Sequence, residues 1–146
     1  MDKVSFKILG EPFGKQRPKF TAVGKFGRAY TPDKTVNYET YVKLTYNSLD
    51  LPKLEGQIAF GVSAYYPIPK STSQKKRNLM LSGAIRPTIK PDYDNIAKII
   101  SDALNGIAYD DDKQIVDARI KKFYSEIPRV EVEISKVSNV GMLGGM

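Results

Sequence analysis

The strongest periodic pattern in the chain lies between Asp94 and Gly106. Apolar residues recur there every three or four positions, at Ile96, Ile99, Ile100, Ala103 and Leu104. This spacing gathers them on one face of a helix, and that face must be buried against another layer. Asp94 is a suitable N-cap, and Asn105-Gly106 is a strong C-terminal stop. The sequence therefore predicts an amphipathic helix over residues 94–104 that packs on a sheet.

Four other segments alternate apolar and polar residues with a period of two, which is typical of half-buried strands. These segments are 3–9, 57–66, 116–121 and 130–135. Two further helices are predicted. One begins at Thr31-Pro32 and ends before Pro52, and a short one follows the Ser71/Gln74 capping box and runs to about Leu81.

Together these elements predict an α+β fold, with a mixed sheet of about four or five strands and two or three helices. No linker divides the 146 residues, so we expect one domain over residues 1–137. The last residues, 138–146, are rich in glycine and have little to anchor them, and we expect a flexible tail.

The chain contains no cysteine and no histidine. Disulfides, zinc sites of the usual nitrogen and sulfur type, cysteine nucleophiles and a histidine general base are therefore excluded. Any catalysis must depend on carboxylates, Lys, Arg, Tyr, Ser or Thr. A hard metal ion that accepts oxygen ligands suits this set of side chains.

The net charge is +7, from 23 basic and 16 acidic residues. A basic surplus on a small domain favours a polyanionic partner. Nucleic acid is preferred over a membrane, because the chain shows no basic amphipathic helix, no lipidation motif and no apolar run of membrane-spanning length. No signal peptide is expected either, so we expect a cytoplasmic protein that works on DNA of the nucleoid.

Residues 13–32 carry five basic residues and aromatic residues between them, but only one acid-free stretch of this kind occurs in the chain. Glycines and prolines interrupt the segment, which predicts an irregular loop suited to phosphate contacts and base stacking. The alternative is a solvated loop whose aromatic residues fold back onto the core. The basic residues are Lys15, Arg17, Lys19, Lys25 and Arg28.

A second basic cluster lies at the predicted short helix and consists of Lys70, Lys75, Lys76 and Arg77. It is either a DNA contact or simply a solvated helix face, and the residues alone leave both interpretations open.

Chemistry is concentrated in the segment Lys90-Pro-Asp-Tyr-Asp-Asn-Ile-Ala-Lys98. In an extended run, Asp92 and Asp94 point to the same side, and Lys98 lies one helical turn beyond Asp94. Two neighbouring carboxylates repel each other unless a cation lies between them. Mg²⁺ commonly takes one or two protein carboxylates, keeps several waters and binds phosphate oxygens with the rest.

Three further acids, Asp110, Asp111 and Asp112, follow the helix. One of them can supply a third ligand to a carboxylate metal site of the kind that activates water against a phosphodiester. The alternatives are that Asp92 and Asp94 only cap a helix, and that the acidic run is a solvated hairpin turn. A calcium EF-hand loop is excluded, because it needs Gly at position 97 and Glu at position 103, where the chain has alanines.

These motifs resemble those of the RusA family of Holliday junction resolvases over residues 6–124. No single piece is decisive, but their order and spacing are specific. The matching pieces are Gly14-Lys-Gln-Arg-Pro-Lys-Phe20, Tyr30-Thr-Pro32, Pro69-Lys-Ser71, Lys90-Pro-Asp-Tyr-Asp-Asn95, Lys98, Asp102-Ala-Leu-Asn-Gly106, Asp111-Asp-Lys-Gln-Ile115 and Lys122.

The resemblance implies a homodimeric, Mg²⁺-dependent endonuclease, with Mn²⁺ as a possible substitute, that cuts four-way DNA junctions by paired nicks. It implies Asp92, Asp94 and Asp112 as metal ligands and Lys98 as the catalytic lysine. It also implies a RusA-like fold and is compatible with a phage-derived origin.

The same resemblance marks Asp111 as a helper and Lys122 as a basic position on the following strand, where we expect a DNA contact. Because Asp110 adds a third acid, the register of Asp111 against Asp112 is open by one residue. Asp112 is favoured, since it stands two residues before Gln114, as in the family motif.

Three functions remain open at this point. The first is junction resolution. The second is a metal-dependent nuclease that acts on flaps, forks or RNA. The third is a basic nucleic-acid-binding module without catalysis, in which the aspartates are structural.

Overall fold

A four-stranded sheet forms the centre of the computed structural model, which describes residues 2–16, 19–23, 26–30 and 33–137, with only the backbone given for 19–23 and 26–30. The strands lie in the order β1-β6-β4-β5. Pairing is antiparallel between β1 and β6 and between β6 and β4, and parallel between β4 and β5. The mixed sheet confirms the predicted α+β class. The strand bounds are Lys3–Leu9 for β1, Ile58–Pro67 for β4, Ile115–Ser125 for β5 and Arg129–Lys136 for β6.

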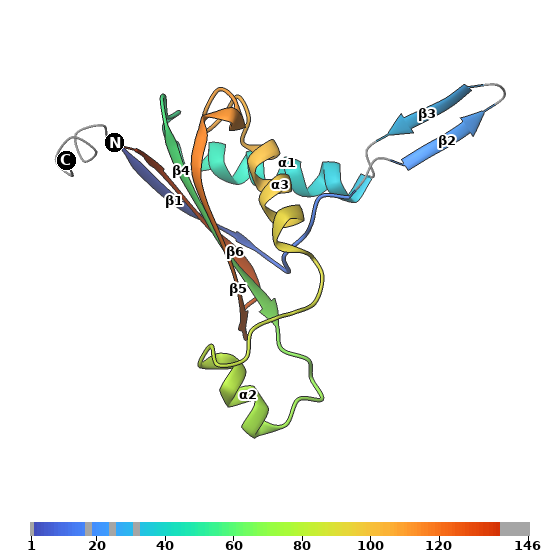
Figure 1. Cartoon of the computed structure of the whole chain (residues 1–146), viewed down its shortest axis with the longest axis vertical. Helices are drawn as coiled ribbons and strands as arrows, with labels where there is room; N and C mark the ends of the chain where they lie inside the picture. Colours follow the sequence, from blue (N-terminus) through green and yellow to red (C-terminus); the bar gives the residue numbers. More distant parts are fainter. Residues whose placement is uncertain (1, 17–18, 24–25, 31–32, 138–146) are drawn as a thin grey trace.

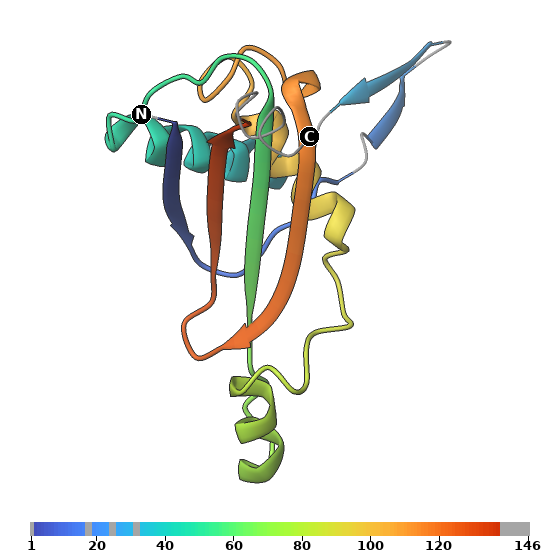
Figure 2. The same cartoon turned by 60° about the vertical axis from the view of Figure 1, so that its left-hand side comes forward.

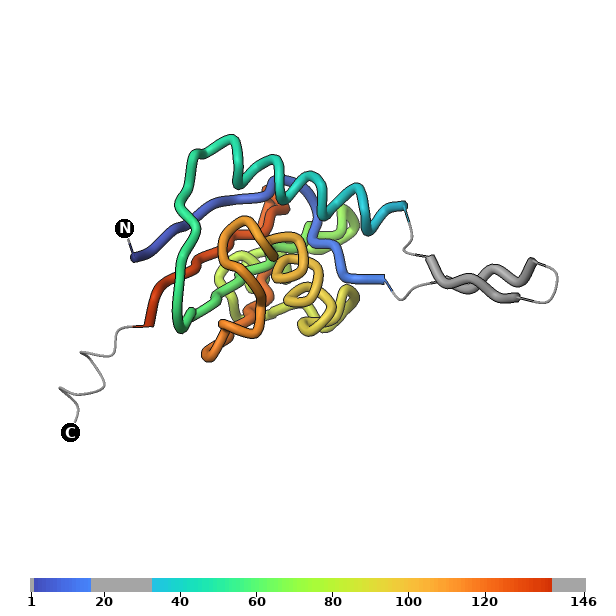
Figure 3. Tube along the Cα trace, turned by 90° about the horizontal axis from the view of Figure 1, so that it is seen from above, coloured from blue at the N-terminus to red at the C-terminus, as the bar shows by residue number. Residues whose placement is uncertain are grey.

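Two helices, α1 (Asp33–Ser48) and α3 (Tyr93–Ala103), cover one face of this sheet (Figure 1). They lie beside each other, with α1 nearer β1 and α3 nearer β5 (Figure 3). A short helix, α2 (Gln74–Leu81), lies beyond the end of the sheet where β4 finishes. The face of the sheet opposite α1 and α3 is bare of described helices (Figure 2).

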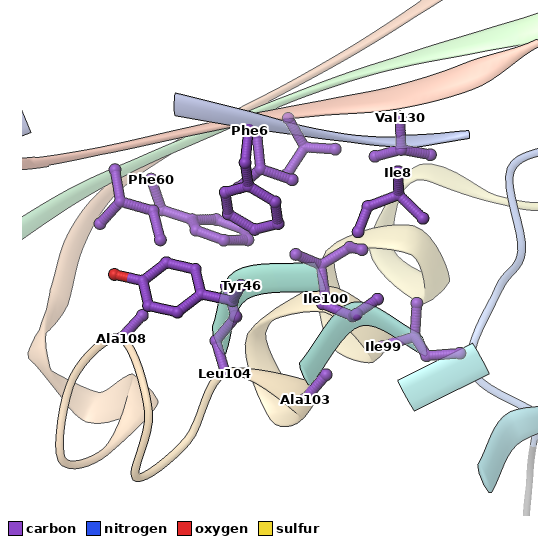
Figure 4. Close-up of a cluster of buried hydrophobic side chains, with 14 of the residues drawn as sticks. Phe6, Ile8, Tyr46, Phe60, Ile99, Ile100, Ala103, Leu104, Ala108 and Val130 are labelled. Atoms are coloured by element: carbon purple, nitrogen blue, oxygen red, sulfur yellow. The ribbon is translucent and has the colours of Figure 1, made fainter. Parts of the chain in front are cut away.

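The core lies between the sheet and the two helices. Phe6, Ile8 and Phe60 project from the strands toward Tyr46 of α1 and Ile100 of α3 (Figure 4). On α3, the isoleucines at 96, 99 and 100 are all fully buried. Burying an isoleucine side chain stabilises the fold by about 1.5–3 kcal/mol, so the apolar face of α3 fixes that helix on the sheet. The prediction from its periodicity is confirmed.

One predicted element is wrong. The segment 13–32 was expected to be an irregular loop, but it contains two paired strands, β2 (Lys19–Val23) and β3 (Phe26–Tyr30). They form a separate two-stranded antiparallel sheet, with Lys19 opposite Tyr30. The segment is rich in aromatic and β-branched residues around Gly24-Lys25, and a two-residue connection between such runs favours a hairpin over a loop.

The cap of α2 also differs from the prediction. Ser73 is the N-cap, and its side chain accepts a hydrogen bond from the Lys76 backbone N–H. Ser71 lies too early in the chain for this role. The predicted tail, 138–146, lies outside the described residues. Among the described residues, no helix combines the length and the apolar character needed to cross a membrane.

A stability measurement tests the packing of α3. We expect Ile100→Ala to lower the free energy of unfolding by about 2–5 kcal/mol, because it leaves a cavity between α3 and the sheet. Val116 on β5 is 58% exposed, and Val116→Ala should cost about 1 kcal/mol or less. Urea unfolding followed by circular dichroism compares the two variants, and equal losses would contradict this description of the core.

Candidate functional site

The N-terminus of α3 presents two exposed carboxylates. Asp92, not Asp94, is the N-cap: its backbone is extended and its carbonyl accepts the first helical hydrogen bond, from Ile96, at 3.1 Å. The predicted N-cap was therefore two residues late, and Asp94 lies in the first turn. The Asp92 carboxylate makes no capping hydrogen bond. Both side chains are exposed at the positive end of the helix dipole.

The loop that leads into Asp92 is held by three side chains, which we call the anchor group: Tyr66, Arg86 and Lys122. The Tyr66 hydroxyl donates to the carbonyl of Pro91 at 2.5 Å. The Lys122 ammonium donates to the carbonyl of Ile89 at 2.7 Å, and Arg86 Nε donates to the carbonyl of Lys122 at 2.8 Å. The anchor group ties the loop to β4 and β5, and so it fixes where α3 begins.

Lys122 is partly withdrawn from solvent by this arrangement. Its ammonium lies 4.9 Å from the centre of the Tyr66 ring. Burial lowers the pKa of Lys122, while the nearby charge of Asp92 acts in the opposite direction. Burial, and to a smaller extent Asp92, raises the pKa of Tyr66 to about 12. Lys122 is thus a neighbour of Asp92 and a structural support of its loop, and its predicted contact with DNA stays a prediction.

Asp92 and Asp94 open into the same hollow. It has a volume of about 500 Å³, and Lys122 and Lys90 also line it. A second hollow, of about 440 Å³, lies on the other side of Asp92 and is lined by Lys90 and by the segment 12–16. The Asp92 carboxylate is therefore accessible from two directions, with basic side chains at the rim.

The first part of the predicted basic segment packs against this end of α3. Gly14 lies so close to the helix that an added Cβ would stand 2.8 Å from the Pro91 Cβ, so only glycine fits. The Lys15 backbone N–H donates to the carbonyl of Asn95 at 2.9 Å. This close contact brings the chain that enters β2 next to Asp92.

The Lys15 side chain does not project into solvent. Its ammonium lies 3.1 Å from a Glu39 carboxylate oxygen and 3.4 Å from one of Asp102. In this structure Lys15 links α1 to α3, and its predicted phosphate contact stays a prediction.

Lys98 lies one turn beyond Asp94, as predicted, and its side chain is 61% exposed. Its ammonium is 3.4 Å from Asp102, one turn further along the same helix. Burial raises the pKa of Asp112, and Asp111 and Asp102 raise it further, whereas Lys98 lowers it. Lys98 therefore stands between the aspartates at the start of α3 and Asp112 after its end.

Asp111 and Asp112 have different environments. Asp111 caps a 3-10 turn (Asp112–Gln114), and its carboxylate accepts from the Lys113 backbone N–H at 2.9 Å. Hydrogen bonding to that N–H lowers the pKa of Asp111. The Asp112 backbone is held by Asn105, which leaves its carboxylate outside the capping network. Of the two acids, Asp112 is the one whose side chain is left for another role, and the run is not a hairpin turn.

The donor set suits a hard divalent metal ion only in part. Asp92 and Asp94 supply oxygen ligands beside one hollow, which is enough for Mg²⁺ with water in its remaining positions. Within the described ranges, no three acidic residues are gathered closely enough to hold a metal ion. Asp112 is thus not brought together with Asp92 and Asp94 here, and its role as third ligand stays a prediction.

The remaining predicted DNA contacts divide into two groups. Lys70, Lys75 and Lys76 are exposed at and before α2. The side chains of Arg17, Lys19, Lys25 and Arg28 lie outside the described residues. Sequence reasoning missed Tyr66 and Arg86, because a strand tyrosine and a loop arginine carry no signal of their hydrogen-bond partners. Asp102 stands in a motif that supports the resemblance, yet no role was expected for it.

Removal of one hydroxyl tests the anchor group. Tyr66→Phe leaves the carbonyl of Pro91 without its donor, and we expect a loss of about 1–3 kcal/mol in unfolding free energy. We also expect faster amide hydrogen exchange in residues 86–95, measured by mass spectrometry. Tyr65→Phe is the matched control on the opposite face of β4. Unchanged exchange in the Tyr66 variant would show that the loop is held by other contacts.

Comparison with known proteins agrees with this geometry. The family described as endodeoxyribonuclease RusA matches residues 10–135, which include the whole site. The chain is also 41% identical over 142 residues to a Bacillus subtilis (strain 168) protein described as uncharacterized protein YqaN, and the match covers 94% of this chain and 99% of that protein. With most of its length matched by the family, the chain belongs to the RusA family of endodeoxyribonucleases.

Proposed function

We propose that this chain is a divalent-metal-dependent endonuclease that resolves four-way (Holliday) junctions as a homodimer. Family membership supports DNA hydrolysis. The observation that carries the proposal is the state of Asp92: it caps α3 with its backbone, but its carboxylate makes no capping hydrogen bond and shares an open hollow with Asp94. A helix cap alone does not require a second exposed acid beside it.

Asp92 and Asp94 would hold the metal ion, Mg²⁺ or Mn²⁺ in its place, and Asp112 is proposed as a third ligand. A bound divalent ion supplies a water of lowered pKa and neutralises charge on the scissile phosphate. The N-terminus of α3 adds favourable potential for a phosphate at the same place.

The other residues of the site orient and balance charge. Lys98, exposed one turn from Asp94, would steady the attacking water or the charge that develops on the phosphate. Asp102 lies 3.4 Å from the Lys98 ammonium and would hold it in place. Lys122 supports the loop that carries Asp92, and Asp111 caps the turn that carries Asp112.

DNA arms would be held by their backbones. Lys70, Lys75 and Lys76 extend from α2 and its preceding loop, at the end of the sheet where the Asp92 loop is anchored. The basic residues of segment 13–32 join the structure beside α3. Phosphate contacts from such lysines give affinity without sequence selection. A two-fold dimer would present two equivalent sites to a junction that has the same symmetry.

Asp92→Asn tests the proposal. The variant keeps the shape of the side chain and removes its charge, so we expect it to bind a four-way junction normally and to lose nicking by at least about 100-fold. Gel-shift and nicking assays with Mg²⁺ measure the two properties. Asp117→Asn, an exposed aspartate on β5, is the matched control and should retain both. Normal nicking by Asp92→Asn would remove the proposal.

The acidic run gives a second test, of the third ligand. We expect Asp112→Asn to lose nicking and to bind Mn²⁺ more weakly in calorimetric titration, because one ligand is lost. Asp111→Asn should change activity less, because it weakens a cap. Asp110→Asn should change neither, since Asp110 pairs with Lys53 at the surface. Full activity in Asp112→Asn together with loss in Asp111→Asn would reverse the assignment of the two residues.

A further inference from the structure

The sheet has an open face, which we define as the side opposite α1 and α3 (Figure 2). Every second residue of each strand points to it, and nearly all of these residues are polar, charged or small. A hollow of about 500 Å³ lies over its middle and is floored by β4. Toward α2 the face is closed, because Arg86 lies over the Phe123 ring at 4.3 Å and that ring stacks on Tyr65.

Small residues form the floor of this hollow, and we call them the β4 trough: Ala59, Gly61 and Ser63. Gly61 stands in the middle of a long strand, where glycine is destabilising relative to a residue with a side chain. The chain itself does not require glycine there. Its φ is not positive, and an added Cβ would approach nothing nearer than 3.7 Å. A glycine at such a position is typical of a place where another backbone comes close.

Charged side chains of opposite sign flank the β4 trough. A basic column lies on β5 and an acidic column on β6, and both are in register with the trough. The residues paired across Gly61 are Arg119 and Glu133, and those paired across Ser63 are Lys121 and Glu131.

The basic column has few partners within the chain. The nearest carboxylate to Arg119 is that of Asp117, at 3.9 Å, and the Arg119 side chain is 76% exposed. Lys121 makes no ion pair with any residue of the described ranges. Two cations on one strand therefore face solvent beside a trough that can admit another backbone.

We infer that a second copy of this chain docks on the open face, with a two-fold axis that runs along β4 between the two sheets. Rotation about this axis places each β4 trough on the other and each basic column on the partner's acidic column. The same register then sets Arg119 opposite Glu133 and Lys121 opposite Glu131, twice over in one interface. Face-to-face sheets of this kind pack about 10 Å apart, and closer where side chains are small.

A nucleic acid does not suit the open face. The acidic column lies in the middle of it, next to the β4 trough, and would repel a phosphate backbone. A surface that carries equal and opposite columns on either side of a small-residue axis is complementary to itself, as an isologous interface must be.

The proposed axis also has a consequence for the site. Rotation about a line parallel to the strands keeps the strand direction, so the β4 ends of both copies lie at the same end of the dimer. The loops that carry Asp92, which are anchored there by Tyr66, would then face one substrate from the same side. This consequence rests on the proposed function, whereas the docking itself does not.

Charge reversal on the full-length chain tests the interface. Glu133→Arg and Arg119→Glu should each weaken the dimer on the order of 100-fold in sedimentation velocity, because each creates two like-charge contacts. The double variant should restore the wild-type dissociation constant, because both members of each pair are exchanged. Lys43→Glu, which makes the same charge change on exposed α1, is the control and should leave the dimer intact.

Gly61→Val removes the close approach without a change of charge. Its Cβ has room within the chain, so the monomer should unfold at the same or a higher urea concentration while the dimer is weakened. A monomer that is itself destabilised would be separated by its unfolding curve, and the charge-reversal pair then decides.

Crosslinking locates the axis. The chain has no cysteine, so single cysteines can be placed freely. Ser63→Cys lies on the proposed axis and should crosslink to its own copy with the shortest bis-maleimide. Lys7→Cys, on the outer strand β1, would lie roughly 20 Å from its copy, four strand spacings away, and should not crosslink.

The outcomes separate this inference from the proposed function. A chain that stays monomeric up to its solubility limit, a dimer unaffected by both single reversals, or a double variant that stays dissociated overturns the inference, whether or not the protein nicks DNA. A dimer that obeys the reversals and the crosslinks but never nicks DNA supports the inference and removes the proposed function.

Discussion

The hydrogen bond from the Tyr66 hydroxyl to the carbonyl of Pro91 joins the sheet to the peptide that starts α3. Tyr66 is itself buried in the middle layer of the molecule, so the bond transmits the position of β4 to Asp92. Lys122 makes a parallel connection from β5. Because β4 and β5 run in the same direction, both connections leave the same end of the sheet, and the site lies where they meet the helix. The rest of α3 is fixed by its buried isoleucines, so the two aspartates have a rigid base.

This base carries more negative charge than the fold needs. Asp92, Asp94, Asp102 and Asp112 lie along or beside one helix, and Lys15 and Lys98 are shared among them. Asp102 holds both lysines, whereas Asp92 and Asp94 remain exposed. A helix N-terminus favours acidic residues to a limited degree, by about 0.3–1 kcal/mol each. That preference accounts for one acid in the first turn, while two acids in one open hollow favour a cationic ligand.

Much of the fold follows from periodicity. Alternation over 3–9 and the isoleucine spacing of α3 are produced by burial on one face, and burial is what the sequence pattern records. The hairpin β2–β3 was missed because Gly27 was interpreted as a breaker, although glycine is tolerated in paired strands. The N-cap was misplaced by two residues because Asp92 and Asp94 are equally good caps, and the anchored loop decides between them.

The site was only partly predictable for a related reason. Residue types and spacing identify Asp92, Asp94 and Lys98, because chemistry restricts which side chains serve a metal ion. Hydrogen bonds such as those of Tyr66 and Arg86 join residues more than 20 positions apart, and nothing in the local sequence specifies such partners. The double ion pair of Lys15 is equally invisible before the helices are placed.

The most direct measurement maps the cuts on a synthetic four-way junction. Each strand is end-labelled in turn, and the wild-type chain is added with Mg²⁺ or with a chelator. The account predicts nicks at symmetry-related positions on two opposed strands, and only when the metal ion is present. Nicks that persist in the chelator, or an intact junction in the presence of both Mg²⁺ and Mn²⁺, would contradict it.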